Sequence, residues 1–556
     1  MLHNGSLNAI ELATCPRDSN NITHIIFSSN FNQVILRDTL PDTITHIIFQ
    51  YCFNQVLLPG TLPQSLVSLV FGCNFNQIIV AGSLPHSLTK LSFGLQYDQE
   101  IEPNALPHSL TELTFGYSFN RSIMPNTLPM GLRTLTFDYR HNQFIHQDAL
   151  PSSLTSLTMS RNYNQHLMPL PPSITFLVLG EEFNQIIDVG VLPTSLRKIR
   201  FSRHYNMEFQ PGVLPQGLQV ITFGNLYKCQ LNNIPSSITK IKLGYWFDEC
   251  LLPGQLPSSL TKLTFGDKYN KPILNGSLPH SLTCLIFGKE FNQPIELGMI
   301  PDRLVTLLFG NRFNSVISPG SFPSNTLKQL SLGSRFKLPI KPGTIPPSIT
   351  QLILPKHWNQ PLGADSLSLP STLTSLTFAR TFNQPIRQGD LPACLTKLFL
   401  GIEFDQIIEP GTLPSRLTHL YIGDHYGQTL VSRSELIFNF GGRFNKPIAP
   451  GVLPNCLQYL GLSTWYNQPI RKGMLPQSLV WLGISEIFKS DIEPGAVPSG
   501  LRILNIYNLV KQGHYIDVIA GIAEASNNDG LEVFVYEMIQ KSSMKIPIVK
   551  ASIWRL

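Results

Sequence analysis

Residues 269–290 read YNKPILNGSLPHSLTCLIFGKE, and FNQPI follows at residues 291–295. The two prolines of this stretch exclude a helical repeat, because proline lacks the backbone N–H donor and clashes inside a helix. The segment SLTCLIFG at residues 281–288 alternates apolar side chains with others, which is the period of a β-strand. The stretch therefore predicts a short strand, a turn at glycine, an aromatic plug at Phe291 and a return arm that its prolines hold extended.

The aromatic-Asn mark of this stretch recurs 22 times along the chain, and the usual step is 22 residues. Steps of 20 occur twice, and steps of 23, 24 and 18 occur once each. The residue after the mark is Asn in 15 copies and Asp in three, and position 141 is the one mark that is not aromatic. The marks are Phe31, Phe53, Phe75, Tyr97, Phe119, His141, Tyr163, Phe183, Tyr205, Tyr227, Phe247, Tyr269, Phe291, Phe313, Phe336, Trp358, Phe382, Phe404, Tyr426, Phe444, Tyr466 and Phe488.

One copy alone cannot bury its leucines and aromatic side chains, but stacked copies can. Burial of several large side chains per copy, at about 1.5–3 kcal/mol each, would drive the stacking. We therefore predict a β-rich solenoid of the α/β leucine-rich-repeat type, with about 22 repeats of 22 residues and one face of parallel strands. The Asn after each plug is predicted to bond the turn backbone and the Asn of the next copy.

The pattern divides the chain into a solenoid at residues 22–507, an N-terminal cap at residues 1–21 and a C-terminal cap at residues 508–556, since solenoid ends need atypical cover. Within the C-terminal cap, residues 516–525 suggest a helix and residues 531–536 a strand. The 18-residue copy between Tyr426 and Phe444 lacks its Pro-Gly and Leu-Pro marks, so we expect a kink or a packing defect there.

The composition excludes several other classes. Hydrophobic residues make up 42 % of the 556 residues and charged residues 14 %, which is too apolar for a disordered chain. No apolar run approaches the ~18 residues of a membrane span, and residues 1–6 lack the basic and apolar regions of a secretory signal. We therefore expect a cytoplasmic protein with free thiols at its eight cysteines and no membrane partner. The net charge of +6 is too mild to indicate nucleic-acid binding by itself.

The blocks FNQPI and LPxSLTxLxFG resemble the FNIP repeat, a 22-residue relative of leucine-rich repeats, and the resemblance extends over residues 22–507. The family is known mainly from amoebae and the large DNA viruses that infect them, so the cytoplasm could be that of a host cell. The resemblance implies a solenoid used for protein–protein contact. Many relatives carry an N-terminal F-box and resemble substrate adaptors of ubiquitin ligases, which implies a link to substrate selection. Here the first predicted strand begins at Ile22, which leaves too few residues before it for an F-box.

Strand alternation should turn two columns of side chains outward, at seven and five residues before each mark. These columns carry seven cations and one acid, Glu112. Five of the cations lie within four successive copies, and we call them the basic patch: Lys198, Arg200, Lys240, Lys242 and Lys262. The patch suits an acidic protein segment or another polyanion, while the alternative is that the lysines keep an exposed strand soluble. No aromatic side chains are interleaved with the patch in these columns, which disfavours single-stranded nucleic acid.

A second candidate surface is aromatic. We call Phe399, Tyr421, Tyr459 and Trp481, all in the same two columns, the aromatic cluster. Outward aromatic side chains suit a contact surface with a partner protein. The alternative is that the C-terminal cap or the irregular copy covers them.

Motifs for catalysis and metal binding are missing from the sequence. It has no C-x-x-C or H-E-x-x-H pair for zinc, no Walker or G-x-G-x-x-G loop, and no G-x-S-x-G turn. His24 and His46 fall on adjacent copies without a third ligand. We therefore expect no enzyme, no metal and no cofactor, and predict an interaction scaffold that binds an unidentified protein partner along its strand face. The alternative function is a polyanion or nucleic-acid binder that uses the basic patch.

Overall fold

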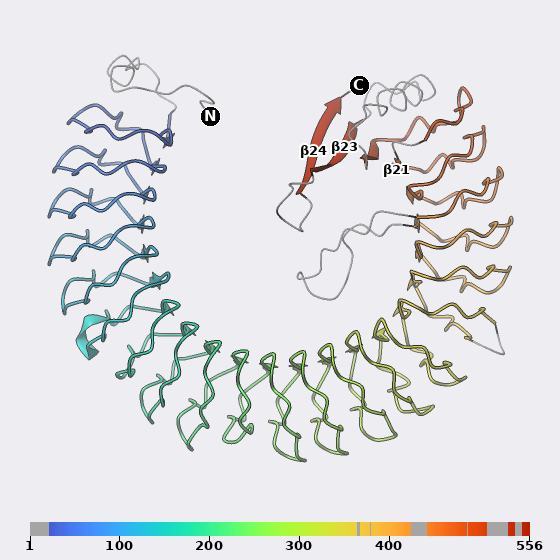
Figure 1. Cartoon of the computed structure of the whole chain (residues 1–556), viewed down its shortest axis with the longest axis horizontal. Helices are drawn as coiled ribbons and strands as arrows, with labels where there is room; N and C mark the ends of the chain where they lie inside the picture. The colour runs from blue at the N-terminus through green and yellow to red at the C-terminus, as the bar shows by residue number, and fades with distance from the viewer. Residues whose placement is uncertain are drawn as a thin grey trace. The chain divides into compact units, whose positions relative to one another are not determined.

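The computed structural model describes residues 22–363, 367–378, 380–423, 442–485, 488–508, 532–539 and 548–555. The chain divides into two compact units, Met1–Tyr269 and Asn270–Leu556. Each unit is a stack of similar turns of chain, and each turn carries one short strand (Figure 1). The predicted N-terminal cap at residues 1–21 lies outside the described residues.

The N-terminal unit contains twelve strands that pair in parallel with their neighbours in chain order. The register follows the repeat, so His24 lies opposite His46 and Ile25 opposite Ile47. The strands are β1 (His24–Ile26), β2 (His46–Ile48), β3 (Ser68–Val70), β4 (Lys90–Ser92), β5 (Glu112–Phe115), β6 (Thr134–Phe137), β7 (Ser156–Thr158), β8 (Phe176–Val178), β9 (Lys198–Arg200), β10 (Val220–Thr222), β11 (Lys240–Lys242) and β12 (Lys262–Thr264).

The C-terminal unit continues the pattern and ends in a hairpin. Its strands are parallel from β13 to β23, and β24 is antiparallel to β23. The strand predicted at residues 531–536 is confirmed as β23, and the helix predicted at residues 516–525 lies outside the described residues. The strands are β13 (Cys284–Ile286), β14 (Thr306–Leu308), β15 (Gln329–Ser331), β16 (Gln351–Ile353), β17 (Ser375–Thr377), β18 (Lys397–Leu400), β19 (His419–Ile422), β20 (Tyr459–Gly461), β21 (Trp481–Ser485), β22 (Ile503–Asn508), β23 (Glu532–Ile539) and β24 (Ile548–Arg555).

The fold is the predicted parallel β-solenoid, with strands shorter than the alternating segment suggested. Most strands span three residues, and the central Leu or Ile is buried while its two neighbours point outward. The described residues contain one short 3-10 turn, η1 (Gln147–Ala149), and no α-helix. The α/β part of the predicted fold class is therefore wrong for the described chain, because the prolines keep the return arm extended.

The aromatic plugs are confirmed as the core. Where a Phe stands four residues before the plug, the two rings pack together, and the ring centroids of Phe71 and Phe75 are 3.7 Å apart. The plugs also stack along the solenoid, with 6.0 Å between Phe53 and Phe75. Both Phe53 and Phe75 are fully buried. The stack thus gives each turn a shared apolar wall with the next, as the repeat requires.

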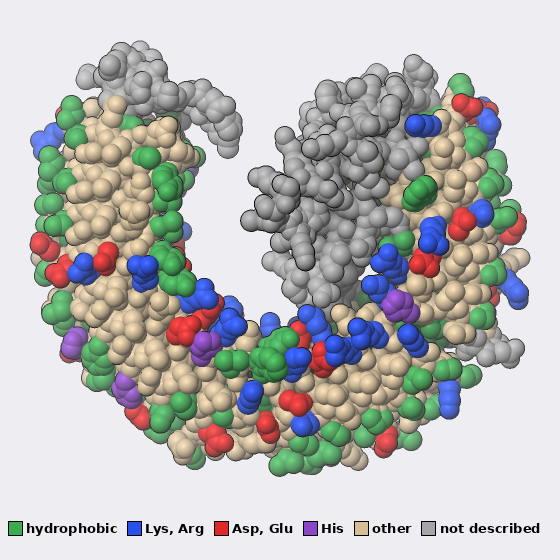
Figure 2. Space-filling model, in the orientation of Figure 1, with side chains coloured by type: hydrophobic (Ala, Val, Ile, Leu, Met, Phe, Trp, Pro, Cys, Tyr) green, Lys and Arg blue, Asp and Glu red, His purple; other side chains and the backbone are tan. Residues whose placement is uncertain are grey.

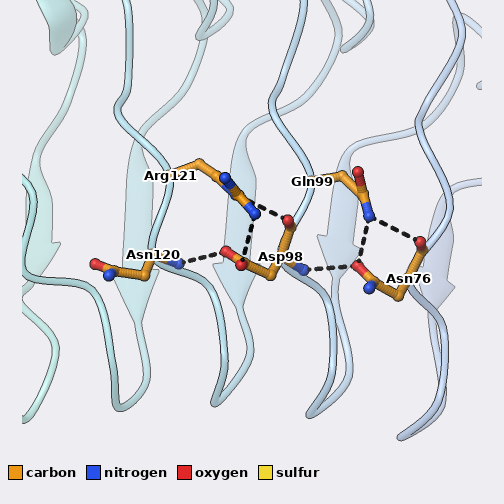
Figure 3. A network of polar contacts seen from close by, with 5 residues as sticks. All are labelled: Asn76, Asp98, Gln99, Asn120 and Arg121. Carbon is orange, nitrogen blue, oxygen red and sulfur yellow. Dashed lines mark hydrogen bonds and ion pairs between the residues drawn. The ribbon is translucent and has the colours of Figure 1, made fainter.

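The Asn after each plug forms the predicted ladder, through its side-chain oxygen (Figure 3). The Asn76 Oδ1 accepts the backbone N–H of Asp98 at 2.9 Å and the side-chain amide of Gln99 at 3.1 Å. The same pattern joins Asn270 to residues 292 and 293 in the C-terminal unit. The ladder satisfies backbone donors that the extended arm would otherwise leave without partners.

Asp replaces Asn in the ladder only where the next turn supplies a cation in place of Gln. Asp98 accepts the Asn120 backbone N–H at 2.9 Å and forms an ion pair with Arg121 at 3.0 Å (Figure 3). Asp405 forms an ion pair with Lys446 at 3.2 Å. The cation thus matches the carboxylate of the preceding turn.

The irregular copy does not interrupt the ladder. β19 pairs directly with β20, so His419 lies opposite Tyr459, and the Phe404 ring stacks on Phe444 with centroids 6.1 Å apart. The kink or packing defect predicted here is therefore not present in the described ladder. Tyr426, the mark of that copy, lies outside the described residues.

The glycine after the strand lets successive turns approach closely. A Cβ on Gly94 would come within 1.7 Å of the Gly72 carbonyl oxygen. Where serine stands at this position, its hydroxyl becomes part of the packing, and the Ser160 Oγ donates to the His141 carbonyl oxygen. The turns therefore stack at near-backbone contact, which fixes the spacing of the outward columns.

Candidate functional site

The variable side chains lie on the strand face of each unit. Since the central strand residue is buried, the first and third residues of each strand form the two outward columns. In-register parallel pairing places equivalent residues about 4.8 Å apart from turn to turn. The strand face therefore presents two straight rows of side chains whose identity changes at every turn.

The structure brings the five residues of the basic patch together on the N-terminal unit. Lys198 and Arg200 lie on β9, Lys240 and Lys242 on β11, and Lys262 on β12, directly opposite Lys240. All five are exposed. Within the described part of the chain none of them forms an ion pair, whereas Lys90 on β4 contacts Glu112 at 3.0 Å.

A neutral strand separates the two double cations of the patch. Val220 of β10 lies between Lys198 and Lys240, and Thr222 lies between Arg200 and Lys242. The two pairs of cations are thus two strand spacings apart, about 10 Å. The side chains of Val220 and Thr222 thus form an uncharged strip of surface with cations on both sides.

A groove runs along the strand ends of the N-terminal unit from β2 to β11, with Ser29 of the turn after β1 also in its lining, and has a volume of about 1160 Å³. One wall is the third strand position, for example Thr136 and Thr158. The floor is the glycine turn at Gly94 and its equivalents, and the other wall is the loop that includes Tyr51 and Tyr139. The groove follows the column that carries Arg200 and Lys242, so two of the five residues of the basic patch contribute to one of its ends.

Charge is unevenly distributed along this groove. Its charged lining residues are, in chain order, Asp138, Arg161, Glu181, Arg200, Arg203 and Lys242. The three before β9 have a net charge of −1, and Arg161 is paired with Glu181 at 2.9 Å. The three from β9 onward sum to +3. One end of the groove is therefore basic and the rest is close to neutral.

Exposed aromatic side chains lie next to the basic patch, on a turn that the strand columns do not include. Tyr245 and Trp246 follow β11 directly, and both are partly exposed. The Lys228 ammonium lies 5.7 Å from the Trp246 ring centre, and the Lys268 ammonium lies 5.3 Å from it. The expectation that aromatics are missing around the patch is thus wrong, because Phe176 of β8 lies opposite Lys198 in the same column, and Tyr245 and Trp246 lie on the neighbouring turn. Figure 2 shows basic side chains interspersed with hydrophobic ones on the face turned to the viewer.

The structure also brings the aromatic cluster together on the C-terminal unit. Phe399 stacks on Tyr421 with ring centroids 5.0 Å apart, and Tyr421 lies 5.8 Å from Trp481. Tyr459 stacks on His419 at 4.3 Å. The Tyr421 ring lies over Gly461, whose missing side chain makes room for it.

The aromatic cluster is half-buried. Burial is the main cause that raises the pKa of Tyr421, and neighbouring Tyr459 adds to it. Residues 424–441 and 509–531, which include parts of the irregular copy and of the C-terminal cap, lie outside the described residues. Both predicted roles of the cluster, contact surface and covered packing, therefore stay predictions.

The described residues contain no group of three or more His, Cys, Asp and Glu side chains that could hold a metal ion. His24 stacks on His46 at 4.1 Å, and burial followed by the charges of His24 and Lys90 lowers the pKa of His46. No disulfide is formed by Cys52, Cys73, Cys229, Cys250, Cys394 or Cys456. Within the described residues, no helix is long and apolar enough to cross a membrane.

The parallel strands, the stacked plugs and the asparagine ladder define a solenoid of the leucine-rich-repeat class. CroV588, a giant-virus protein described as a novel circular LRR protein, is 35 % identical, with a TM-score of 0.74 over 95 % of this chain and 78 % of that one. The FNIP Repeat family matches the chain in segments from residue 19 to 434 and from 444 to 508, and the chain belongs to this family. The resemblance seen in the sequence is thus confirmed.

Of two more distant structures that match, TLR13 shares the fold and no more. TLR13, solved in complex with ssRNA13, is 13 % identical with a TM-score of 0.50, and covers 92 % of this chain and 84 % of that one. YopM from Yersinia enterocolitica is 18 % identical with a TM-score of 0.39 over 88 % of each chain. The comparison with curated proteins gave no match.

Proposed function

We propose that this chain is a non-enzymatic interaction scaffold that binds a protein partner along its exposed parallel-strand face. One observation carries the proposal: the repeated apolar side chains are buried in the plugs and at the strand centres, while the two outward columns of the strand face change from turn to turn. A rigid row of variable side chains suits recognition assembled from many weak contacts with a few anchors. The fold, the family and the lack of catalytic motifs in the sequence support this reading.

The proposal is tested by obstructing the strand face. Thr136→Tyr together with Thr158→Tyr would place bulky side chains on adjacent strands, β6 and β7. The control pair, Ser122→Tyr and Gln210→Tyr, adds the same bulk on exposed return arms. Affinity capture from cell extract, quantified by mass spectrometry, should lose the partner with the first pair and keep it with the control. Equal capture by both pairs would contradict the proposal.

The second candidate function is binding of a polyanion or nucleic acid through the basic patch. It is favoured by one specific observation, the exposed Tyr245 and Trp246 beside Lys228 and Lys268. Base stacking on aromatic side chains next to cations is how many proteins hold single-stranded nucleic acid. TLR13, which shares the fold, was solved with an RNA, so the fold accommodates such a partner in that protein. Steep loss of affinity with added salt, measured with a single-stranded oligonucleotide, would support this candidate.

The family resemblance also motivates a proposed link to substrate selection by ubiquitin ligases in the cytoplasm of an amoebal host. The same capture experiment tests it, because ligase subunits should then be recovered with the chain. Recovery of a partner without any ligase subunit would remove this link and leave the scaffold function intact.

A further inference from the structure

The groove of the N-terminal unit has a length, a shape and a charge gradient that indicate what it can hold. We propose that it binds an extended peptide segment of about 13 residues that crosses the strands, with a cluster of acidic residues at the end that reaches β9–β11. This inference rests on the proposed scaffold function and names the chemistry of the partner.

The length follows from the turns that line the groove. It extends over the strand ends from β2 to β11, which is nine strand spacings. At about 4.8 Å per spacing the groove is about 43 Å long, and an extended chain at about 3.3 Å per residue needs about 13 residues to fill it. A folded element such as an α-helix, about 10 Å wide with its side chains, would be a poor fit to a groove that follows a single column.

The walls of the neutral part suit an extended peptide. Thr114, Thr136 and Thr158 place small side chains on consecutive strands along one wall. Gly94 and Gly116 also line the groove, and because their missing side chains let successive turns stack closely, this part of the lining is formed by backbone. These surfaces offer shallow, repeated contacts and no deep pocket for a large side chain.

The basic end supplies the specificity. Arg200, Arg203 and Lys242 line it, and none of them forms an ion pair within the described residues. Lys198, Lys240 and Lys262 lie in the neighbouring column of the same strands. In the neutral part, Arg161 is paired with Glu181, and beside it Lys90 is paired with Glu112. The acidic residues of a partner would therefore be drawn to β9–β11 and to no other part of the groove.

An acidic peptide explains the groove better than a nucleic acid does. A nucleic-acid strand carries a phosphate at every nucleotide, whereas cations without an acidic partner line the groove only at the turns of β9 and β11, and Asp138 lines the neutral part. The exposed Tyr245 and Trp246 do not line the groove. Nucleic acid is therefore treated as a competing outcome of the test.

The test uses the full chain and three fluorescein-labelled probes in fluorescence anisotropy. The first is a 13-residue peptide of Ser, Thr and Gln with four consecutive Glu at one end. The second has the same composition with the four Glu evenly spaced, and the third is a 13-nucleotide oligouridylate. The expected result is that the clustered peptide binds about tenfold more tightly than the spaced one, and that added salt weakens both.

Charge reversal locates the site. Arg200→Glu with Lys242→Glu should weaken the clustered peptide by about tenfold or more. The control pair Lys337→Glu and Lys341→Glu makes the same change in net charge on exposed positions of the C-terminal unit and should leave binding unchanged. All four positions are exposed, so the variants are expected to fold, and circular dichroism checks this.

Three outcomes would overturn the inference: equal binding of the clustered and spaced peptides, equal loss of binding in both reversal pairs, or tighter binding of the oligouridylate than of the clustered peptide. None of them affects the scaffold function, which depends on the capture experiment with the tyrosine variants. If that capture fails while the clustered peptide still binds, the groove is a real site and the partner contacts the chain elsewhere.

Discussion

His141 occupies a plug position in the core, and it is the one mark of the repeat that is not Phe, Tyr or Trp. Its ring stacks between Phe119 and Tyr163, with centroids 5.7 and 6.2 Å away, and it is 1 % exposed. Neither ring nitrogen has a partner in a well-formed hydrogen bond. Burial lowers the pKa of His141 to about 4, and the backbone of Arg121 opposes the shift in part. We predict that this residue makes the N-terminal unit sensitive to acid.

The magnitude follows from the pKa. Between pH 6.5 and about 4 the unfolded chain binds a proton at His141 that the folded chain does not. The contribution of neutral His141 to the free energy of unfolding is therefore fully present above pH 6.5 and is lost as the pH falls toward 4. At about 1.4 kcal/mol for each pH unit, the whole interval amounts to about 3 kcal/mol, and about 2 kcal/mol of it is lost by pH 5. His141→Phe removes the titration and completes the aromatic stack.

The assay is urea unfolding at pH 7 and pH 5, with hydrogen exchange of β6 and β7 to localise the effect. His141→Phe should be more stable than the natural chain at pH 7 by about 1–2 kcal/mol, because a buried polar group without partners is removed. Its advantage should grow by about 2 kcal/mol at pH 5. Tyr163→Phe, in the neighbouring plug, is the control and should show no such growth. An advantage that is the same at both pH values would refute the reasoning.

Three further predictions concern single contacts of the solenoid. Arg121→Gln should lose about 0.5–1 kcal/mol of unfolding free energy, since Asp98 then lacks its cation, and the double change with Asp98→Asn should restore stability within error, measured by thermal unfolding. Gly94→Ala should cost about 2–3 kcal/mol in the same measurement, because its Cβ would come within 1.7 Å of a carbonyl oxygen of the preceding turn, and a loss below 1 kcal/mol would contradict the close stacking. Gly461→Ala should displace the tyrosine ring above it, which a new Cβ would approach to 2.7 Å, and should raise acrylamide quenching of Trp481. Unchanged quenching would show that the ring does not depend on the glycine.

The sequence was sufficient to predict most of the fold, because the same pattern of buried, hydrogen-bonding and strand residues recurs in nearly every copy of the repeat. The plug, the Asn ladder and the parallel strands follow from side chains that recur, so a chance pattern could be excluded without coordinates. The irregular copy could not be placed in this way. Its missing marks at residues 427–443 indicated an irregularity, but the direct pairing of β19 with β20 depends on contacts between Gly423 and Gly442, far apart in sequence.

The candidate site was predicted only in part. Lys198, Lys240 and their neighbours could be grouped from the sequence, because strand alternation and register determine which side chains share a column. The groove could not be predicted, since it depends on how closely successive turns approach. Tyr245 and Trp246 were missed because the columns alone were considered, although their position directly after a strand that carries two lysines was a signal that could have been used.

The pairing of Asp with a cation on the next turn limits where the solenoid can gain or lose a repeat. A gene can lose or duplicate a unit between two Asn-Gln turns and still leave every junction satisfied. A deletion of residues 120–141 would instead bring Asp98 against Gln143 and leave the carboxylate without its counter-charge. Asp405 pairs with Lys446, although the copy that begins at Tyr426 lies between them in the sequence, so this charge match joins turns that are neighbours in space. Two turns joined by an Asp–cation pair therefore have to be kept together, whereas turns joined by Asn and Gln can be exchanged for one another.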